Sequence, residues 1–327
     1  RTAYANQEAV AHYERALALL DSALSRAKPT PADGRDDTWR LEALKGLGRV
    51  YLQMGKVREA ESSLRAAIAL GQKMGLPPRE QVRPLFWLGE TLYWQGRYED
   101  RIRVGEQGLA LLGDDTESVE TALMNQTLAL GYEDSEEWEK YHQITYRTAA
   151  FLKRLPYSQE LRAPYVHVQG ICRADKNMEQ ALAWNQELQQ RATRHHDLLA
   201  LLEVSLHMGI HCCQGGDLRG MLPHAQQMLE LCTRIGNVLR ESWSMFLMAQ
   251  SWLRLGDPQQ ARGFATRALK AAQTVRDERT IALVSQIEGQ ASHCLGEWEA
   301  ARDAFRRAVE LFRAIPLRML VAPALNL

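Results

Sequence analysis

The side chains best suited to chemistry in this 327-residue chain lie in one short run, His207-Met208-Gly209-Ile210-His211-Cys212-Cys213. His207 and His211 are four positions apart, which places both on one face of a helix, and Cys212 is a chemically plausible third zinc ligand. No fourth ligand follows at a suitable spacing. The competing interpretation leaves the histidines partly exposed and puts Cys212 in the core. We favour it and predict no metal.

Other chemical patterns are absent or have simpler explanations. The paired carboxylates Glu136-Glu137 and Asp114-Asp115 fall in expected turns, where acidic residues cap helices. The sequence has no phosphate-binding Gly-x-x-x-x-Gly-Lys-[Ser/Thr], no Gly-x-Ser-x-Gly and no His-Glu-x-x-His. We therefore predict that the protein is not an enzyme and has no cofactor.

The composition restricts the partners. Forty Lys and Arg residues balance forty Asp and Glu residues, so no net field attracts nucleic acid or an anionic membrane. The five cysteines are odd in number and never form Cys-x-x-Cys, which is typical of core residues in a reducing compartment. No apolar run reaches the ~20 residues of a membrane helix, and no signal peptide is visible. We expect a cytoplasmic protein and, because the chain starts at Arg1 within a repeat, part of a longer polypeptide.

A recurring turn motif predicts the helices that carry these residues. Each copy begins with glycine, and the copies are separated by multiples of about 40 residues, at Gly55, Gly96, Gly216, Gly256 and Gly296. Apolar residues at helical spacing flank each copy, and glycine supplies the positive φ that ends one helix before the next begins. The period fits one helical hairpin and predicts a linear array.

The hairpins have a recognisable residue pattern. One unit places apolar and small residues at positions 4, 7, 8, 11, 20, 24 and 27, namely Leu44, Leu47, Gly48, Tyr51, Ala60, Leu64 and Ala67. This pattern resembles the tetratricopeptide repeat, extended from about 34 to about 40 residues. The resemblance implies an all-α, right-handed α-solenoid of about seven and a half repeats. Residues 4–17 resemble the start of the repeat region in bacterial signal-transduction ATPases, including maltose-type transcription activators.

The register gives the boundaries of one predicted domain over residues 1–327. It comprises a half repeat (1–27), a loop (28–37), repeats over about 38–78, 79–117, 118–157, 158–197, 198–237, 238–277 and 278–316, and a truncated helix (317–327). Arg101, Gly105 and Gly108 stand where small or apolar residues are expected in one second helix. Because glycine weakens a helix interior, we expect that helix to open more readily than its counterparts.

The resemblance places a concave binding face on the first helix of each repeat, at positions 2, 5, 9, 12 and 13. The candidate partner-binding residues there are Lys45, Arg49, Arg83, Phe86, Glu90, Tyr93, Trp94, Trp243, Phe246 and Gln250. Aromatic rings beside arginine are typical of binding hot spots. The residues alone leave a second interpretation open, in which these rings pack between repeats.

We therefore predict a non-catalytic interaction or sensor scaffold that binds a protein or peptide partner in its groove and regulates a fused or partner module. The alternative is a receptor domain of a transcription regulator, in which the groove aromatics stack on a small effector such as an oligosaccharide. The resemblance to maltose-type activators implies this second function.

Overall fold

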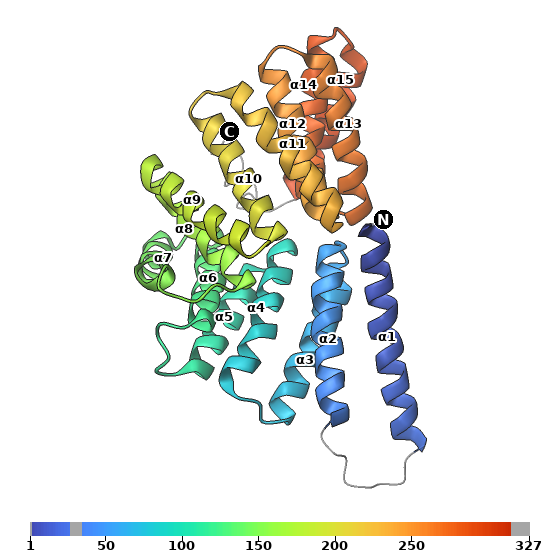
Figure 1. The fold of residues 1–327 in the computed structure, drawn as a ribbon. Coiled ribbons are helices and arrows are strands. Elements are labelled where there is room, and N and C mark those ends of the chain that lie inside the picture. The colour runs from blue at the N-terminus through green and yellow to red at the C-terminus, as the bar shows by residue number, and fades with distance from the viewer. Residues whose placement is uncertain (1, 27–34, 315–327) are drawn as a thin grey trace. The chain divides into compact units, whose positions relative to one another are not determined.

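The computed structural model describes residues 2–26 and 35–314, and all regular structure in that part is helical (Figure 1). One 3-10 turn, η1 (Gln159–Leu161), accompanies fifteen α-helices within it. The helices are α1 (Thr2–Arg26), α2 (Arg35–Gln53), α3 (Val57–Lys73), α4 (Pro78–Trp94), α5 (Tyr98–Leu112), α6 (Val119–Asp134), α7 (Trp138–Leu152), α8 (Arg162–Ala174), α9 (Met178–Arg194), α10 (Leu198–Gln214), α11 (Leu218–Ile235), α12 (Val238–Arg254), α13 (Pro258–Val275), α14 (Glu278–Cys294) and α15 (Trp298–Ala314).

The helices pair into hairpins in the predicted order, from α2–α3 to α14–α15. The loop expected over 28–37 is too long, because residues 35–37 already belong to α2; residues 27–34 lie outside the described part, as does the helix expected over 317–327. The described helices include none with the length and hydropathy of a membrane span.

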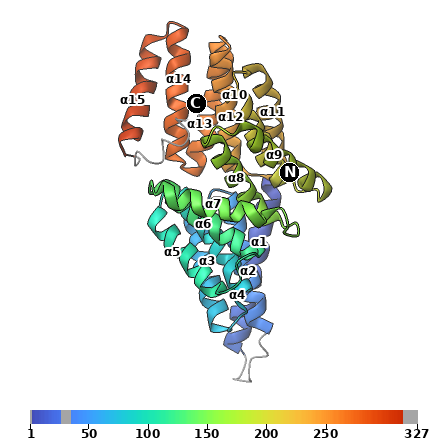
Figure 2. The same cartoon turned by 90° about the vertical axis from the view of Figure 1, so that its left-hand side faces the viewer.

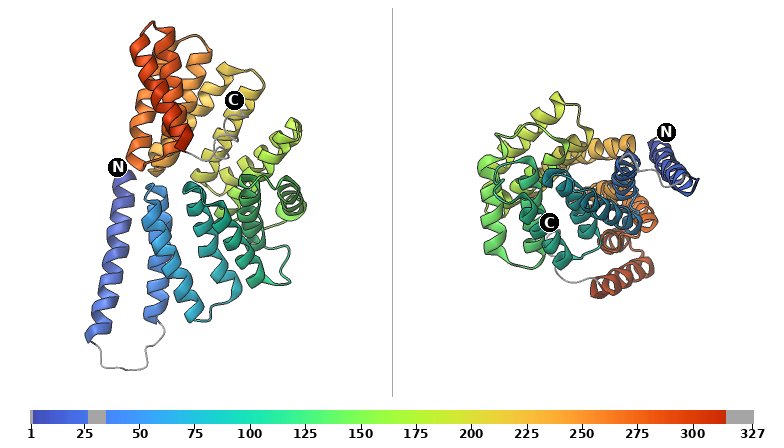
Figure 3. Two further views of the ribbon diagram at one scale, coloured as in Figure 1. Left: turned by 180° about the vertical axis from the view of Figure 1, so that it is seen from behind. Right: turned by 90° about the horizontal axis from the view of Figure 1, so that it is seen from below.

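The contacts divide the chain into two compact units, Arg1–Pro156 and Tyr157–Leu327. In the first unit α2 to α5 lie side by side (Figure 3), and in the second α12 to α15 do (Figure 2). First helices also contact one another, α2 with α4 and α4 with α6 in the first unit, α8 with α10 and α12 with α14 in the second. The grouping of all repeats into one domain stays a prediction.

The turns follow the predicted mechanism. The five recurring glycines have φ between 68° and 85°. In the first hairpin a hydrogen bond across the turn follows, in which the Lys56 amide donates to the Tyr51 carbonyl over 2.8 Å. Where the motif lacks glycine the geometry persists, with φ of 62° at Glu136 and 61° at Lys176. These two residues therefore adopt a conformation that L-amino acids rarely favour.

Small residues allow the paired helices to approach closely. A Cβ atom on Gly48 would lie 2.5 Å from Leu64 Cγ, and one on Gly105 would lie 2.5 Å from Leu128 Cγ and 3.2 Å from the Leu128 amide nitrogen. Gly105 therefore seats α6 against α5. The sequence-based expectation counted Gly105 only as a loss of helix propensity, whereas in the structure it also permits packing.

Candidate functional site

The predicted surface on α4 is partly open. Arg83 is exposed, whereas Glu90, Tyr93 and Trp94 are half-buried. Arg83 Nη2 lies 3.2 Å from Glu120 Oε1 on α6. The rings of Tyr93 and Trp94 meet edge to face with centroids 5.4 Å apart. These four side chains stay candidate contacts for a partner, with neighbours on α4, α5 and α6.

Two predicted cations lie on α2. The guanidinium carbon of Arg49 lies 5.0 Å from the centroid of the Trp87 ring, a cation–π contact that joins α2 to α4. Lys45 Nζ instead lies 2.6 Å from Glu42 Oε1 within its own helix. The structure therefore brings Arg49, but not Lys45, against an aromatic ring of α4.

Three predicted contact residues are buried. Phe86 is 0% exposed, Phe246 is 1% exposed and Gln250 is 8% exposed. Phe86 packs edge to face on Trp87, with centroids 5.2 Å apart, and Phe246 belongs to the apolar core that runs from α10 to α14. The expectation that these three side chains face an open groove is wrong, because the first helices pack on one another through this face as well as on their own hairpin partners.

Trp243 is the one predicted contact on α12 that keeps some exposure. Its ring lies 5.1 Å from that of Phe246, and the Arg279 guanidinium carbon lies 5.6 Å from its centroid. Trp243 therefore repeats, in the second unit, the pairing of a first-helix tryptophan with an arginine from an adjacent first helix.

Arg101 on α5 is a buried charge whose environment the sequence did not reveal. Its side chain is fully buried, with Nη2 3.5 Å from Glu90 Oε1 and Nη1 3.8 Å from Asp134 Oδ2. Its guanidinium carbon lies 5.0 Å from the centroid of Tyr93. The visible signal was a charged residue at position 20 of the repeat, where alanine is expected.

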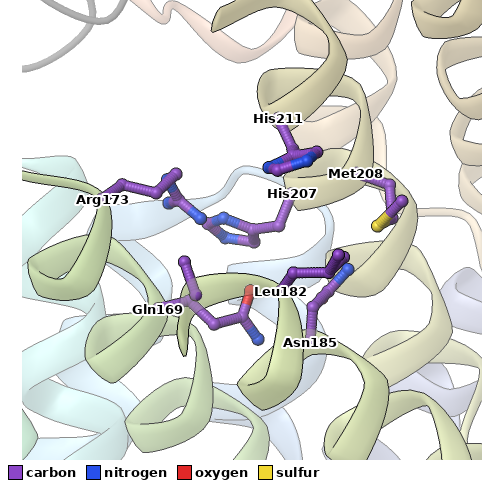
Figure 4. Close-up of a pocket in the computed structure, with 8 residues that line it drawn as sticks. Gln169, Arg173, Leu182, Asn185, His207, Met208 and His211 are labelled. Carbon is purple, nitrogen blue, oxygen red and sulfur yellow. The ribbon is translucent and has the colours of Figure 1, made fainter. Parts of the chain in front are cut away.

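A pocket in the second unit lies among α8, α9 and α10 (Figure 4). It contains about 190 Å³ of empty space, part of it open to solvent. Among its described lining residues none is acidic; those that matter for its chemistry are Gln169, Arg173, Leu182, Asn185, His207 and Met208. Sequence reasoning did not predict this site.

Buried polar atoms without hydrogen-bond partners gather around this pocket. Gln169 is 0% exposed, and both its amide oxygen and its amide nitrogen lack a partner. Asn185 Nδ2 donates to the Val204 carbonyl over 3.3 Å, which leaves Oδ1 as an unpaired acceptor. His207 Nδ1 is also unpaired. Figure 4 shows that the three side chains come from three helices and surround the same space.

His207 is neutral at neutral pH. Burial holds its pKa well below the ordinary value, and the charges of Arg173 and Arg240 lower the pKa further. The favoured interpretation of the sequence is thus wrong in two details, because His207 is buried and because Cys213, rather than Cys212, is the buried cysteine. Within the described residues, no three histidine, cysteine or acidic side chains group as metal ligands would.

Comparison with known proteins agrees with this architecture. Residues 43–78, which span most of the first hairpin and the start of α4, match the tetratricopeptide repeat family. The fold is that of tetratricopeptide-repeat proteins. No curated protein matches the sequence of this chain.

Solved structures with tetratricopeptide-like folds match most of the chain. A Rap protein complexed with competence and sporulation factor has 12% identity and a TM-score of 0.65, covering 90% of this chain and 79% of its own. A signal transduction ATPase with a tetratricopeptide repeat sensor, from Pyrococcus horikoshii, has 13% identity and a TM-score of 0.57, covering 96% and 52%. The apo quorum sensor NprR from B. thuringiensis has 13% identity and a TM-score of 0.50, covering 95% and 97%. At these identities the likeness shows the fold alone.

The tetratricopeptide register also locates the signal for the pocket. Gln169 occupies position 8, where the other hairpins place glycine or alanine, and Asn185 occupies position 24. Two polar residues at these packing positions, in one and the same repeat, are visible in the sequence. The interpretation of that repeat as merely a weaker match overlooked them.

Proposed function

We propose that this chain is a non-catalytic regulatory domain that binds a peptide segment of a protein partner on the first helices of its repeats. The observation that carries the proposal is the half-open surface of α2 and α4, where Arg49 lies over Trp87, the half-buried rings of Tyr93 and Trp94 meet edge to face, and Arg83 is exposed at the other end of α4. Partly exposed aromatic rings such as those of Tyr93 and Trp94 supply large contact area at a small entropy cost. The Rap protein, solved with a bound factor, has a similar fold, which supports the proposal.

The second predicted function, recognition of an oligosaccharide-like effector, has no comparable support. Pockets that bind small molecules usually hold about 300–1,000 Å³. Even with the open solvent that it includes, the space among α8, α9 and α10 amounts to only about 190 Å³, which is too small for several sugar rings.

The test is selection of binding peptides from a library of random heptapeptides, followed by calorimetry with the enriched sequences. Trp94→Ala and Arg83→Ala should each weaken binding by about tenfold or more, as expected for hot-spot residues. Trp39→Ala is the matched control, because Trp39 is 68% exposed on α2 and is not one of the candidate contacts. Failure to enrich any peptide, or an equal loss in Trp39→Ala, would contradict the proposal.

A further inference from the structure

The α4–α5 hairpin carries a charge at a position where four other hairpins have alanine. Arg101 occupies position 20 of the repeat, on α5, and its side chain is fully buried. The alanines at the same position are also buried, namely Ala60, Ala181, Ala261 and Ala301. A buried charge has lost its water, which is unfavourable unless protein groups replace the lost hydrogen bonds. The presence of arginine at this position therefore needs a physical explanation.

A gain in stability does not explain it. Among the described residues, none is a hydrogen-bond partner for Nε, Nη1 or Nη2 of Arg101. Its two ion pairs are long, at 3.5 Å to Glu90 and 3.8 Å to Asp134. Well-packed apolar residues often stabilise a fold as well as a buried ion pair or better, because desolvation of the charges offsets their attraction. We therefore expect Arg101 to serve something other than the free energy of unfolding.

The neighbours of Arg101 on α4 are two of the candidate contacts for a partner. The guanidinium carbon lies 5.0 Å from the centroid of the Tyr93 ring, and Nη2 is the atom nearest to the Glu90 carboxylate. Tyr93 in turn meets Trp94 edge to face. Glu90, Tyr93 and Trp94 are half-buried, so each is packed on one side and exposed on another. Arg101 lies on the packed side and has no surface with which to contact a ligand.

A guanidinium can orient both of its neighbours on α4 at once. It is attracted to the face of an aromatic ring and to a carboxylate, so the placement of Tyr93 relative to Glu90 depends on its charge. An apolar side chain of similar length would fill the same volume without attracting either group. Side chains that become immobile on binding weaken the affinity, and side chains that are already held in place do so less.

We propose that Arg101 is a positioning residue for the peptide-binding surface, which holds Glu90 and Tyr93, and through Tyr93 also Trp94, in the arrangement that the peptide contacts. This proposal rests on the proposed function, because it assigns a role within the same surface. Asp134 on α6 supplies the second carboxylate beside Arg101. All five residues belong to the first unit.

Affinity and stability are measured in the same variants. The probes are the heptapeptides that the selection enriches, titrated by calorimetry into the full chain. Arg101→Met removes the charge and keeps a side chain of similar length, so it should bind these peptides about tenfold more weakly, as expected for loss of a desolvated cation–π contact. Its midpoint in urea unfolding should stay close to that of the native chain. Arg101→Lys keeps a cation beside the ring and should bind within about threefold of the native chain.

Two further measurements test the route through Tyr93. In the chain without peptide, magnetisation transfer between the ring protons of Tyr93 and Trp94 should be strong, because their centroids lie 5.4 Å apart, and it should weaken in Arg101→Met. A double-mutant cycle then compares affinities. In the Tyr93→Leu background, Arg101→Met should weaken binding by less than about threefold, because the ring that it positions is already absent.

Tyr141→Leu is the matched control. Tyr141 is buried at position 20 of the next hairpin, on α7, and its ring meets those of Trp138 and His142 on the same helix. The variant disturbs the core of the first unit at the equivalent position, so it should lower the urea midpoint and change the affinity by less than about twofold. A loss of affinity as large as that of Arg101→Met would show that any disturbance of the first unit weakens binding, which would refute a specific role for Arg101.

Other results would also overturn the proposal. A urea midpoint of Arg101→Met far below that of the native chain, or failure of the variant to fold, would show that Arg101 is structural. Equal losses of affinity in Arg101→Met and Arg101→Lys would show that the charge is irrelevant. An undiminished loss in the Tyr93→Leu background would show that Arg101 does not act through Tyr93.

Failure of this inference and failure of the proposed function have different outcomes. If heptapeptides bind and Arg101→Met binds them as tightly as the native chain does, the positioning role fails and the peptide-binding function stands. If the selection enriches no heptapeptide while magnetisation transfer between Tyr93 and Trp94 still weakens in Arg101→Met, the proposed function fails and Arg101 remains the residue that orders the two rings.

Discussion

Gly105→Ala should destabilise the first unit, although alanine is the better helix former. Gly105 lies in the middle of α5, where helix propensity alone predicts a gain of ~1 kcal/mol. Against this, the new Cβ would lie 2.5 Å from Leu128 Cγ and 3.2 Å from the Leu128 amide nitrogen. A change of the Leu128 rotamer cannot relieve both contacts, because one of them is to the Leu128 backbone in α6.

Overpacking of this kind costs about 1–3 kcal/mol. The contact with backbone favours the upper part of that range, so after subtraction of the propensity gain we expect a net loss of about 1–2 kcal/mol in the free energy of unfolding. For a unit of this size such a loss corresponds to a fall of about 2–8 °C in melting temperature. Hydrogen exchange of the α5 amides should accelerate in the variant.

Gly263→Ala is the matched control. Gly263 lies within α13 and is exposed, and a Cβ atom added there would have no heavy atom of another side chain or helix within 4 Å. The control should gain about 0.5–1 kcal/mol from propensity alone. Urea unfolding followed by circular dichroism measures both changes. If Gly105→Ala is stabilised as much as Gly263→Ala, the argument that Gly105 exists for close packing is refuted.

Three further predictions follow from buried residues. The unfolded chain protonates His207 below about pH 6.5 whereas the folded chain does not, so the free energy of unfolding should fall as pH drops below that value, by up to ~1.4 kcal/mol per pH unit. In urea titrations at pH 7, 6 and 5, His207→Gln should show a smaller fall than the native chain. An equal fall in both chains would contradict the neutral histidine. Phe86→Ala should lose about 3–5 kcal/mol in urea unfolding, and a loss below 1 kcal/mol would mean that Phe86 is exposed after all. Arg101→Met should leave stability within about 1 kcal/mol or raise it, because an apolar residue of similar volume replaces a buried charge without good hydrogen bonds; a loss above 3 kcal/mol would show that Glu90 and Asp134 stabilise the native Arg101.

The helices were predictable because the turn motif fixes their register. Gly55 and the motifs that follow it mark where hairpins turn, and Gly55 and Gly96 lie between the two helices of their hairpins, although α2 and α4 begin before the expected repeat boundaries at 38 and 79. The faces of the first helices were harder to predict. Position 5 points outward from its own hairpin, yet Phe86 is buried, because α4 also packs on α2 and α6. Contacts between repeats depend on three-dimensional stacking, which one repeat's periodicity does not contain.

The polar pocket illustrates a different limit. Gln169 and Asn185 were visible as departures from the repeat pattern, but a departure alone does not distinguish a poorly matched repeat from a specialised one. To make that distinction, one must know whether the two side chains are buried and which hydrogen bonds they form. Both depend on how α10, which carries Val204 and His207, packs against α8 and α9. The sequence did show that both departures fall in one hairpin, at positions 8 and 24, which contact each other in α2–α3 and α14–α15.

The left-handed turn residues have a consequence for engineering this scaffold. Glu136 and Lys176 hold φ values of 62° and 61° that glycine adopts without strain, and both side chains are exposed at the ends of their hairpins. In a linear array, each repeat contributes its own stability plus that of its nearest interfaces. The two hairpins α6–α7 and α8–α9 can therefore be strengthened one at a time by glycine at these turns, without changing any residue that lines the polar pocket.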